Sequence, residues 1–568
     1  MLHITDLPLI VVDLIIQFAT KHMEIYGNAA WHQYIPLLAV NRTWRNTLKL
    51  KAYRHAYFNK TRLHRARQSK TRTNIGLIKF SNNTHLAKTL ELSLDNHTCV
   101  GQFLDQYLSV FEFVKHGWTN VTTVKFRINP VSAMTVGIIT PNPHDELVPQ
   151  LSCFIEQLVQ HMPNVNTLVI KSSIESRLTR TLSTELIYGY KYNLRSVVSD
   201  LFMPLNLAGA FGNLTQLNIS LNPASEILIP KVNIEIIQLL RLTNVPLYFS
   251  WNILLSDKNT KMVEFSSLKT LKLEFVKEKD DNTEYSIANA NTCDSNDSIG
   301  SQISFPKLQN IIIINNPGAD FANQIYKFSE QLYLINITNS LSTLYMLSKF
   351  NTQSVGVINI RFSNINRINE HEFYKSTNLF FKSNRKYTSS VIDLFHVNLN
   401  IDWEQIKWQT LDYLKIDDCE FNTMLIIIEK LPTLKKLELY RLFANDLPEH
   451  INDLMFFTYP SQLSVQPIKS NIEYLGALLI AGNNIKPNVF VSCTQHLLLQ
   501  LTSLKSLDIF NCTWMGLVRF VEEYKLWFPH LANVDVGIEY DKANKMMEQS
   551  GNTHLFSLMG SGPRTNMS

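Results

Sequence analysis

The chain has 568 residues, more than one ordinary globular core can organise, so it forms either several domains or a repetitive fold. A hydrophobic share of 45% excludes a chain that is disordered throughout, and a net charge of +5 indicates no partner by itself. The 6 cysteines are scattered without a Cys-x-x-Cys pair, which argues against a zinc framework and favours a reducing compartment, so we expect a cytoplasmic or nuclear protein.

The first predicted element is a helix from Asp6 to Ala19. Asp6 suits the helix cap and Pro8 suits the first turn. The helix is apolar on nearly every side, so a second face is left to pack on a partner or, alternatively, on the end of a repeat array. Asp6 and Asp13 bracket the apolar run and no Lys or Arg precedes it, which argues against a signal peptide. No run in the sequence approaches the roughly 20 apolar residues of a membrane span.

A second predicted helix runs from about Pro36 to Phe58, with apolar residues at helical spacing. Leu7-Pro8, followed by Val40-Asn-Arg-Thr-Trp44-Arg45, resembles the F-box motif. That motif opens with Leu-Pro, continues as an aliphatic helix and closes with a Val-x-x-x-Trp-Arg helix. The chain departs from it at Ile10, where an acidic residue is usual, and in a longer middle segment.

The resemblance implies that residues 1–58 form a small all-α F-box-like module. Such a module binds the Skp-type adaptor of a cullin–RING ubiquitin ligase. The first five implied adaptor-binding residues supply apolar contacts, and the last three hold the third helix in place. They are Leu7, Pro8, Val12, Ile15, Ile16, Val40, Trp44 and Arg45.

A basic zone follows. Between Ile25 and Leu90 there are 13 Lys or Arg residues and no Asp or Glu, whereas the rest of the chain carries 40 basic and 48 acidic residues. Arg62-x-x-Arg65-x-Arg67 resembles a nuclear-import patch. The segment 42–72 could neutralise phosphates of a nucleic acid. We favour a solvated basic linker over 59–84, because no RNA-binding fold signature accompanies the charges. Nucleic acid is thus the less favoured partner, and we expect no membrane partner.

From about residue 85 one phrase recurs, with apolar residues at its first, fourth, seventh and ninth positions, as in Leu431-Pro-Thr-Leu-Lys-Lys-Leu-Glu-Leu439. The alternation at its end predicts a strand with one buried face. Helical patterns precede Pro163 and Pro529, so strands and helices alternate and the strands should be parallel. A phrase at this spacing indicates a solenoid. Its copies begin at Trp118, Met162, Phe211, Phe265, Phe305, Trp408, Leu431, Leu501 and Phe528.

These repeats are similar to the leucine-rich-repeat family, in which Asn or Cys is the ninth residue of a Leu-x-x-Leu-x-Leu-x-x-Asn/Cys stretch; here the stretch begins at the fourth position of the phrase. Here Asn316, Cys419 and Cys512 are among the residues at that place, and we interpret both cysteines as buried. The fold class expected is therefore α/β, an irregular leucine-rich-repeat solenoid over 85–540 preceded by the all-α module. We expect a flexible polar loop at 277–302 and a disordered tail at 541–568.

No sequence motif for catalysis, a metal or a cofactor is present, so we expect no enzyme. The expected working surface is the outward side of the strands, where a protein client would bind. The function implied by both resemblances is a substrate receptor of a cullin–RING ubiquitin ligase. The alternative is a repeat scaffold outside any ligase. The predicted client-binding residues are Lys272, Lys415, Asp417, Glu438, Tyr440, Asp508 and Phe510.

Overall fold

A computed structural model describes the chain as two compact units, Met1–Leu268 and Lys269–Ser568. Before residue 53 it describes single residues only: Val11, Leu14, Arg42, Arg45, Asn46 and Lys49. Beyond that point the described ranges are 53–62, 69–95, 117–129, 147–172, 177–202, 212–221, 233–247, 249, 251, 262–277, 302–317, 321, 324–350, 354–362, 370–383, 389–395, 410–443, 468–479, 498–510 and 530–537.

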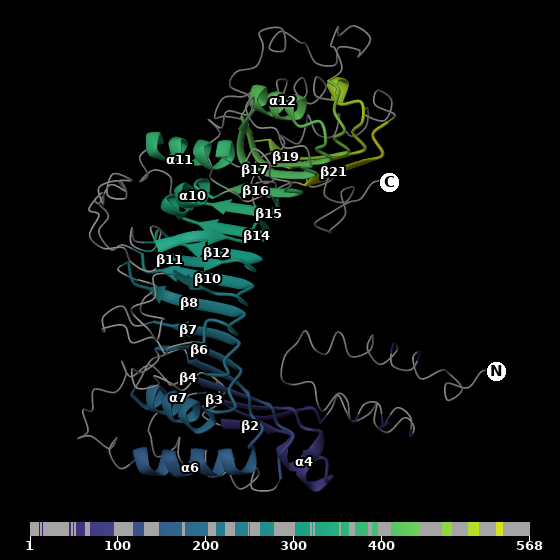
Figure 1. Cartoon of the computed structure of the whole chain (residues 1–568). Coiled ribbons are helices and arrows are strands. Elements are labelled where there is room, and N and C mark those ends of the chain that lie inside the picture. Colours follow the sequence, from purple (N-terminus) through teal and green to yellow (C-terminus); the bar gives the residue numbers. More distant parts are fainter. Residues whose placement is uncertain are drawn as a thin grey trace, which may run out of the picture. The chain divides into compact units, whose positions relative to one another are not determined.

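In the sheet of the first unit β1 pairs in parallel with β3, and from β3 to β8 each strand pairs in parallel with the next one along the chain (Figure 1). Only β2 runs antiparallel among these strands, pairing with β1. The strands of this sheet are β1 (His55–Arg62), β2 (Ser69–Thr73), β3 (Thr89–Asp95), β4 (Thr123–Asn129), β5 (Thr167–Ser172), β6 (Ser196–Phe202), β7 (Gln216–Ser220) and β8 (Leu239–Val245), and the short strand β9 (Met262–Glu264) is not part of it. The helical elements are α4 (Ile75–Phe80), the 3-10 turn η2 (Thr84–Leu86), α6 (Leu147–His161) and α7 (Arg177–Tyr190).

The second unit has the same plan. Its main strands pair in parallel, in chain order, and α10 packs against α11 (Figure 1). They are β10 (Thr270–Phe275), β12 (Asn310–Ile314), β14 (Gln331–Thr338), β15 (Ser354–Arg361), β16 (Val391–Phe395), β17 (Tyr413–Glu420), β18 (Lys436–Phe443), β19 (Tyr474–Leu479), β20 (Ser506–Phe510) and β21 (Asn533–Gly537). A separate parallel pair is β11 (Gln302–Phe305) with β13 (Ile325–Phe328). The helices are α10 (Leu341–Ser348), α11 (Glu370–Ser383) and α12 (Phe421–Lys430).

The recurring phrase explains the core. Leu431, Leu434, Leu437 and Leu439 are all buried. The first two close a tight turn, because the Leu434 amide donates to the Leu431 carbonyl at 3.1 Å. The last two lie on one face of β18, in register with equally buried residues of β17. Because strand side chains alternate between faces, one face of each strand is apolar and the other is left for solvent.

The helices cover the apolar face. In α12, Met424, Ile427 and Ile428 are buried and the helix contacts β17. In α6, Phe154, Ile155 and Leu158 are buried, which confirms the helix predicted before Pro163. The prediction of a mixed α/β fold with a large parallel sheet is confirmed in both units. In the part of the chain that the structure describes, no helix has the length and apolarity that a membrane crossing requires.

A ladder of asparagines was not predicted. In several copies the third residue of the phrase is Asn, and its side-chain amide donates to a backbone carbonyl of the preceding turn. Asn120 bonds to His85 at 2.7 Å and Asn164 to Thr119 at 2.7 Å. Asn213 bonds to Tyr192 at 3.1 Å in the same way. These bonds join neighbouring turns directly, so the repeats are linked outside the sheet as well as within it.

Some local predictions were wrong. The helix predicted to end at Phe58 ends earlier, because β1 begins at His55 and pairs with β3. A looser copy of the phrase has apolar residues at Ile392, Phe395 and Val397, and this spacing predicts the last two as the buried strand positions. In the structure the buried residues of β16 are instead Ile392 and Leu394. The loose spacing of that copy allowed two registers. Register with Leu414 and Ile416 of β17 selects the observed one, because it continues the buried rows.

Several predictions fall outside the described residues. These are most of the module at 1–58, positions 278–301 of the polar loop, the tail at 541–568, the helix before Pro529 and Cys512. Cys419 is buried, as predicted. The segment 59–84, predicted as a linker, includes the end of β1, all of β2 and α4, and the first residue of η2.

Candidate protein-interaction surface

The outward face of the second unit carries a row of side chains, one from each main strand, which we call the central row. Parallel pairing aligns each member with the next, for example Lys415 with Glu438. Four of the predicted client-binding residues, Lys272, Lys415, Glu438 and Asp508, lie in this row. The full row is Lys272, Ile312, Asn336, Asn359, Asp393, Lys415, Glu438, Gly476, Asp508 and Asp535.

The other three predicted client-binding residues lie in the same strands. Asp417 is in β17, Tyr440 in β18 and Phe510 in β20, and their side chains are outside the described part of the structure.

A second row lies two residues earlier in each strand, and we call it the first row. It includes Tyr413, Lys436 and Tyr474, which face one another across β17, β18 and β19. Sequence reasoning missed these residues because it considered only positions between and after the last two apolar residues of each phrase. The available signal was alternation, since the residue before a strand's first buried position also points outward.

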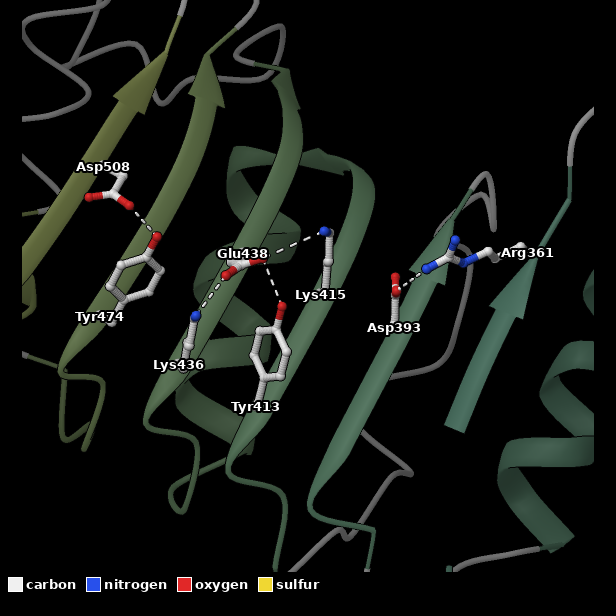
Figure 2. Close-up of polar contacts among 8 residues, drawn as sticks. All are labelled: Arg361, Asp393, Tyr413, Lys415, Lys436, Glu438, Tyr474 and Asp508. Carbon is white, nitrogen blue, oxygen red and sulfur yellow. Dashed lines mark hydrogen bonds and ion pairs between the residues drawn. The ribbon is translucent and has the colours of Figure 1, made fainter. Parts of the chain in front are cut away.

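Glu438 is the centre of the polar contacts on this face (Figure 2). Its Oε2 atom accepts a hydrogen bond from the Tyr413 hydroxyl at 2.7 Å and lies 3.6 Å from Lys415 Nζ. Its Oε1 atom lies 2.8 Å from Lys436 Nζ. The one carboxylate therefore ties together side chains from both rows and from two strands.

The same diagonal contact recurs on the next strands. The Tyr474 hydroxyl donates to Asp508 of β20, as Tyr413 donates to Glu438 of β18 (Figure 2). In both cases a first-row tyrosine reaches the central-row carboxylate one strand further along. Gly476 makes room for the second contact, because a Cβ there would lie 3.1 Å from the Tyr474 hydroxyl oxygen.

Lys436 stands between the two tyrosines. Its Nζ atom is 5.0 Å from the Tyr413 ring centroid and 4.5 Å from the Tyr474 ring centroid. Both distances are within the range of cation–π attraction. The ammonium group is thus held by two ring faces and by Glu438.

Arg361 and Asp393 extend the polar surface across β15 and β16. The Arg361 guanidinium donates to Asp393 Oδ2 at 2.8 Å (Figure 2). This pair, the Glu438 cluster and the Tyr474–Asp508 pair lie on one face of the sheet. The apolar side chains of the same strands are buried on the other face.

The pKa values reflect this arrangement. Burial raises the pKa of Tyr413 and of Tyr474, and the hydrogen bonds to Glu438 and Asp508 raise them further, so both hydroxyls stay protonated donors. Burial alone would raise the pKa of Glu438. The hydrogen bonds from Lys436 and Tyr413, with the charges of Lys436 and Lys415, outweigh burial and place the pKa below its ordinary value.

A separate charged band lies at the start of the strands. Asp412 Oδ1 lies 3.7 Å from Lys435 Nζ, and Glu473 Oε2 lies 3.2 Å from Lys505 Nζ. These side chains line an open cavity of about 630 Å³ together with His530. The band is exposed and its charges alternate, which is typical of a solvated edge.

The outward face presents charged groups, hydrogen-bonding groups and aromatic rings. Among the described residues, no group of three His, Cys, Asp or Glu side chains is arranged to hold a metal ion.

Of the predicted adaptor-binding residues, Arg45 is helical and exposed, and Leu7, Pro8, Val12, Ile15, Ile16, Val40 and Trp44 lie outside the described residues.

Comparison of the chain with protein-family models gives no match, and comparison with curated proteins gives none.

Proposed function

We propose that the chain is a leucine-rich-repeat-like interaction protein that binds a protein client on the outward face of the parallel strands of its second unit. The observation that carries the proposal is the set of aligned polar and aromatic side chains from Arg361 to Asp508, opposite the apolar face. Repeat proteins of this kind use such extended surfaces for binding. Aromatic residues and arginine are also the side chains enriched at binding hot spots.

The resemblance at Leu7-Pro8 and at Val40, Trp44 and Arg45 supports a more specific role. In that role the chain is the substrate receptor of a cullin–RING ubiquitin ligase. The N-terminal helices bind the Skp-type adaptor while the outward face holds the client. The chain itself performs no chemistry, because proximity of the client to a ubiquitin-carrying enzyme supplies the rate gain.

The adaptor contact is tested by co-precipitation of the full chain with the Skp adaptor. The variant Leu7→Asp/Ile16→Asp should lose the adaptor, because a charge on the apolar surface cannot be desolvated without a partner. Arg361→Glu should retain it. Point substitutions are preferable to deleting residues 1–58, because that deletion would remove His55, Ala56, Tyr57 and Phe58, which pair with β3. Equal adaptor recovery by wild type and the double variant would leave the non-ligase scaffold as the better account.

A further inference from the structure

The cations of the outward face are more exposed than the carboxylates that hold them. The side chains of Arg361, Lys415 and Lys436 are 54%, 42% and 44% exposed. Those of Asp393 and Glu438 are 15% and 25% exposed. A partner approaching this face therefore meets positive groups first, with the compensating negative charge beneath them.

These cations are also held in place. The Arg361 guanidinium is fixed by Asp393, and Lys436 by Glu438 and two tyrosine rings. A long cationic side chain loses rotamer freedom when it binds a ligand, and this loss weakens binding. Side chains that are already ordered avoid much of that loss, so this strip is prepared for an anionic ligand.

We propose that Arg361, Lys415 and Lys436, here called the cationic strip, bind an acidic segment of the protein client. The inference rests on the proposed function and specifies the chemistry of the partner. The strip spans the three strand intervals from β15 to β18, or about 14 Å at roughly 4.8 Å per interval. An extended peptide covers that distance in about four residues. The ligand is therefore an extended segment with two or three carboxylate or phosphoryl groups within about five residues.

A basic client segment fits less well, because its charges would meet the three exposed cations before reaching Asp393 or Glu438. The cations of the strip are already paired with carboxylates. This pairing also argues against a nucleic-acid ligand, because nucleic acids favour dense positive charge that is not paired with carboxylates.

The test is a selection of random 12-residue peptides on the immobilised full chain, followed by affinity measurement of synthetic copies. Four variants are compared with wild type. Arg361→Glu/Lys415→Glu/Lys436→Glu reverses the strip, and the matching glutamine triple only removes its charge. Lys269→Glu/Lys435→Glu/Lys505→Glu makes the same change in net charge at exposed lysines outside the strip. Asn359→Trp blocks the central row beside the strip without changing charge. Thermal unfolding of each variant confirms that it is folded.

We expect the selection to enrich acidic peptides. Their affinity should fall at least about tenfold for both strip variants and for Asn359→Trp. The control triple should bind them with the affinity of wild type. Raising NaCl should weaken binding, and phosphoserine copies of the peptides separate phosphoryl from carboxylate recognition. Peptides that Asn359→Trp abolishes but that are not acidic would overturn the cationic strip and leave the proposed function standing. Peptides indifferent to Asn359→Trp, or no selected peptides, would overturn both. An RNA oligonucleotide that binds the strip when no acidic peptide does would overturn the inference.

Discussion

The Tyr474 side chain lies across Gly476 of its own strand. A Cβ at position 476 would be 3.2 Å from Tyr474 Cε1 and 3.4 Å from Glu438 Cγ. Glycine at this place in the central row therefore lets the tyrosine reach Asp508 on the next strand. The Tyr474–Asp508 contact therefore depends on the absence of a side chain at Gly476 as well as on the two residues that form it.

This relationship predicts a graded series of Gly→Ala substitutions. Gly212→Ala should change the free energy of unfolding by less than about 0.5 kcal/mol, because nothing lies within 4 Å of its added Cβ. Gly476→Ala should cost about 1 kcal/mol, since the Tyr474 ring has to move. Gly356→Ala should cost more, about 2 kcal/mol, because its Cβ would lie 2.9 Å from the Tyr333 backbone oxygen. Urea unfolding of the three variants checks the order, and equal losses at all three positions would contradict it.

The lowered pKa of Glu438 predicts a contribution to stability that depends on pH. In the unfolded chain the carboxyl returns to its ordinary pKa of 4.5, so in this region the unfolded state binds more protons. The contribution is present above pH 4.5 and is lost as the pH falls through the lower folded-state value. Glu438→Gln should therefore be less stable than wild type at neutral pH and lose part of the acid dependence below pH 4.5. Unfolding midpoints of both proteins, measured at pH values from about 3 to about 7, check this expectation. Parallel curves for the two proteins would count against it.

The asparagine ladder predicts small, additive losses. Asn120→Ala, Asn164→Ala and Asn213→Ala each remove one side-chain hydrogen bond to a backbone carbonyl. Each should cost about 0.5–1 kcal/mol, at the low end because the sites are exposed. The sites belong to different turns, so the triple variant should lose about the sum. Asn164→Asp serves as the control, because it keeps the shape without the donor and should lose as much as Asn164→Ala. Full stability of Asn164→Asp would show that the amide hydrogen bond contributes nothing.

The strand positions could be predicted because burial repeats with a fixed spacing in the phrase. The same reasoning found Lys415, Glu438 and Asp508, which lie between the last two apolar positions of the phrase in their strands. It could not find the diagonal contacts, because these depend on which strand lies next to which. β19 carries Ala477 where a better copy of the phrase has a large apolar residue, so this strand and its Tyr474 escaped notice.

Other features depended on tertiary pairing. The apolar spacing from Pro36 continues smoothly to Phe58, which favours a helix in isolation. Residues 55–60 instead pair with β3, so hydrogen bonding to the sheet overrides the local pattern. The basic residues Lys60, Arg62, Lys70 and Arg72 also lie in paired strands. Their segments pair as β1 and β2, a connection between distant residues that charge content does not reveal.

The central claim is that the client binds the outward face of the parallel strands of the second unit. A photo-crosslinking amino acid with a small aliphatic diazirine side chain, which does not block the central row as tryptophan would, tests it directly in cells when placed at Asn359 or at the exposed Glu429 of α12. We predict a discrete crosslinked protein from position 359 that disappears in the Arg361→Glu/Lys415→Glu/Lys436→Glu background, and no such product from position 429. Crosslinking from position 429 alone would contradict the account.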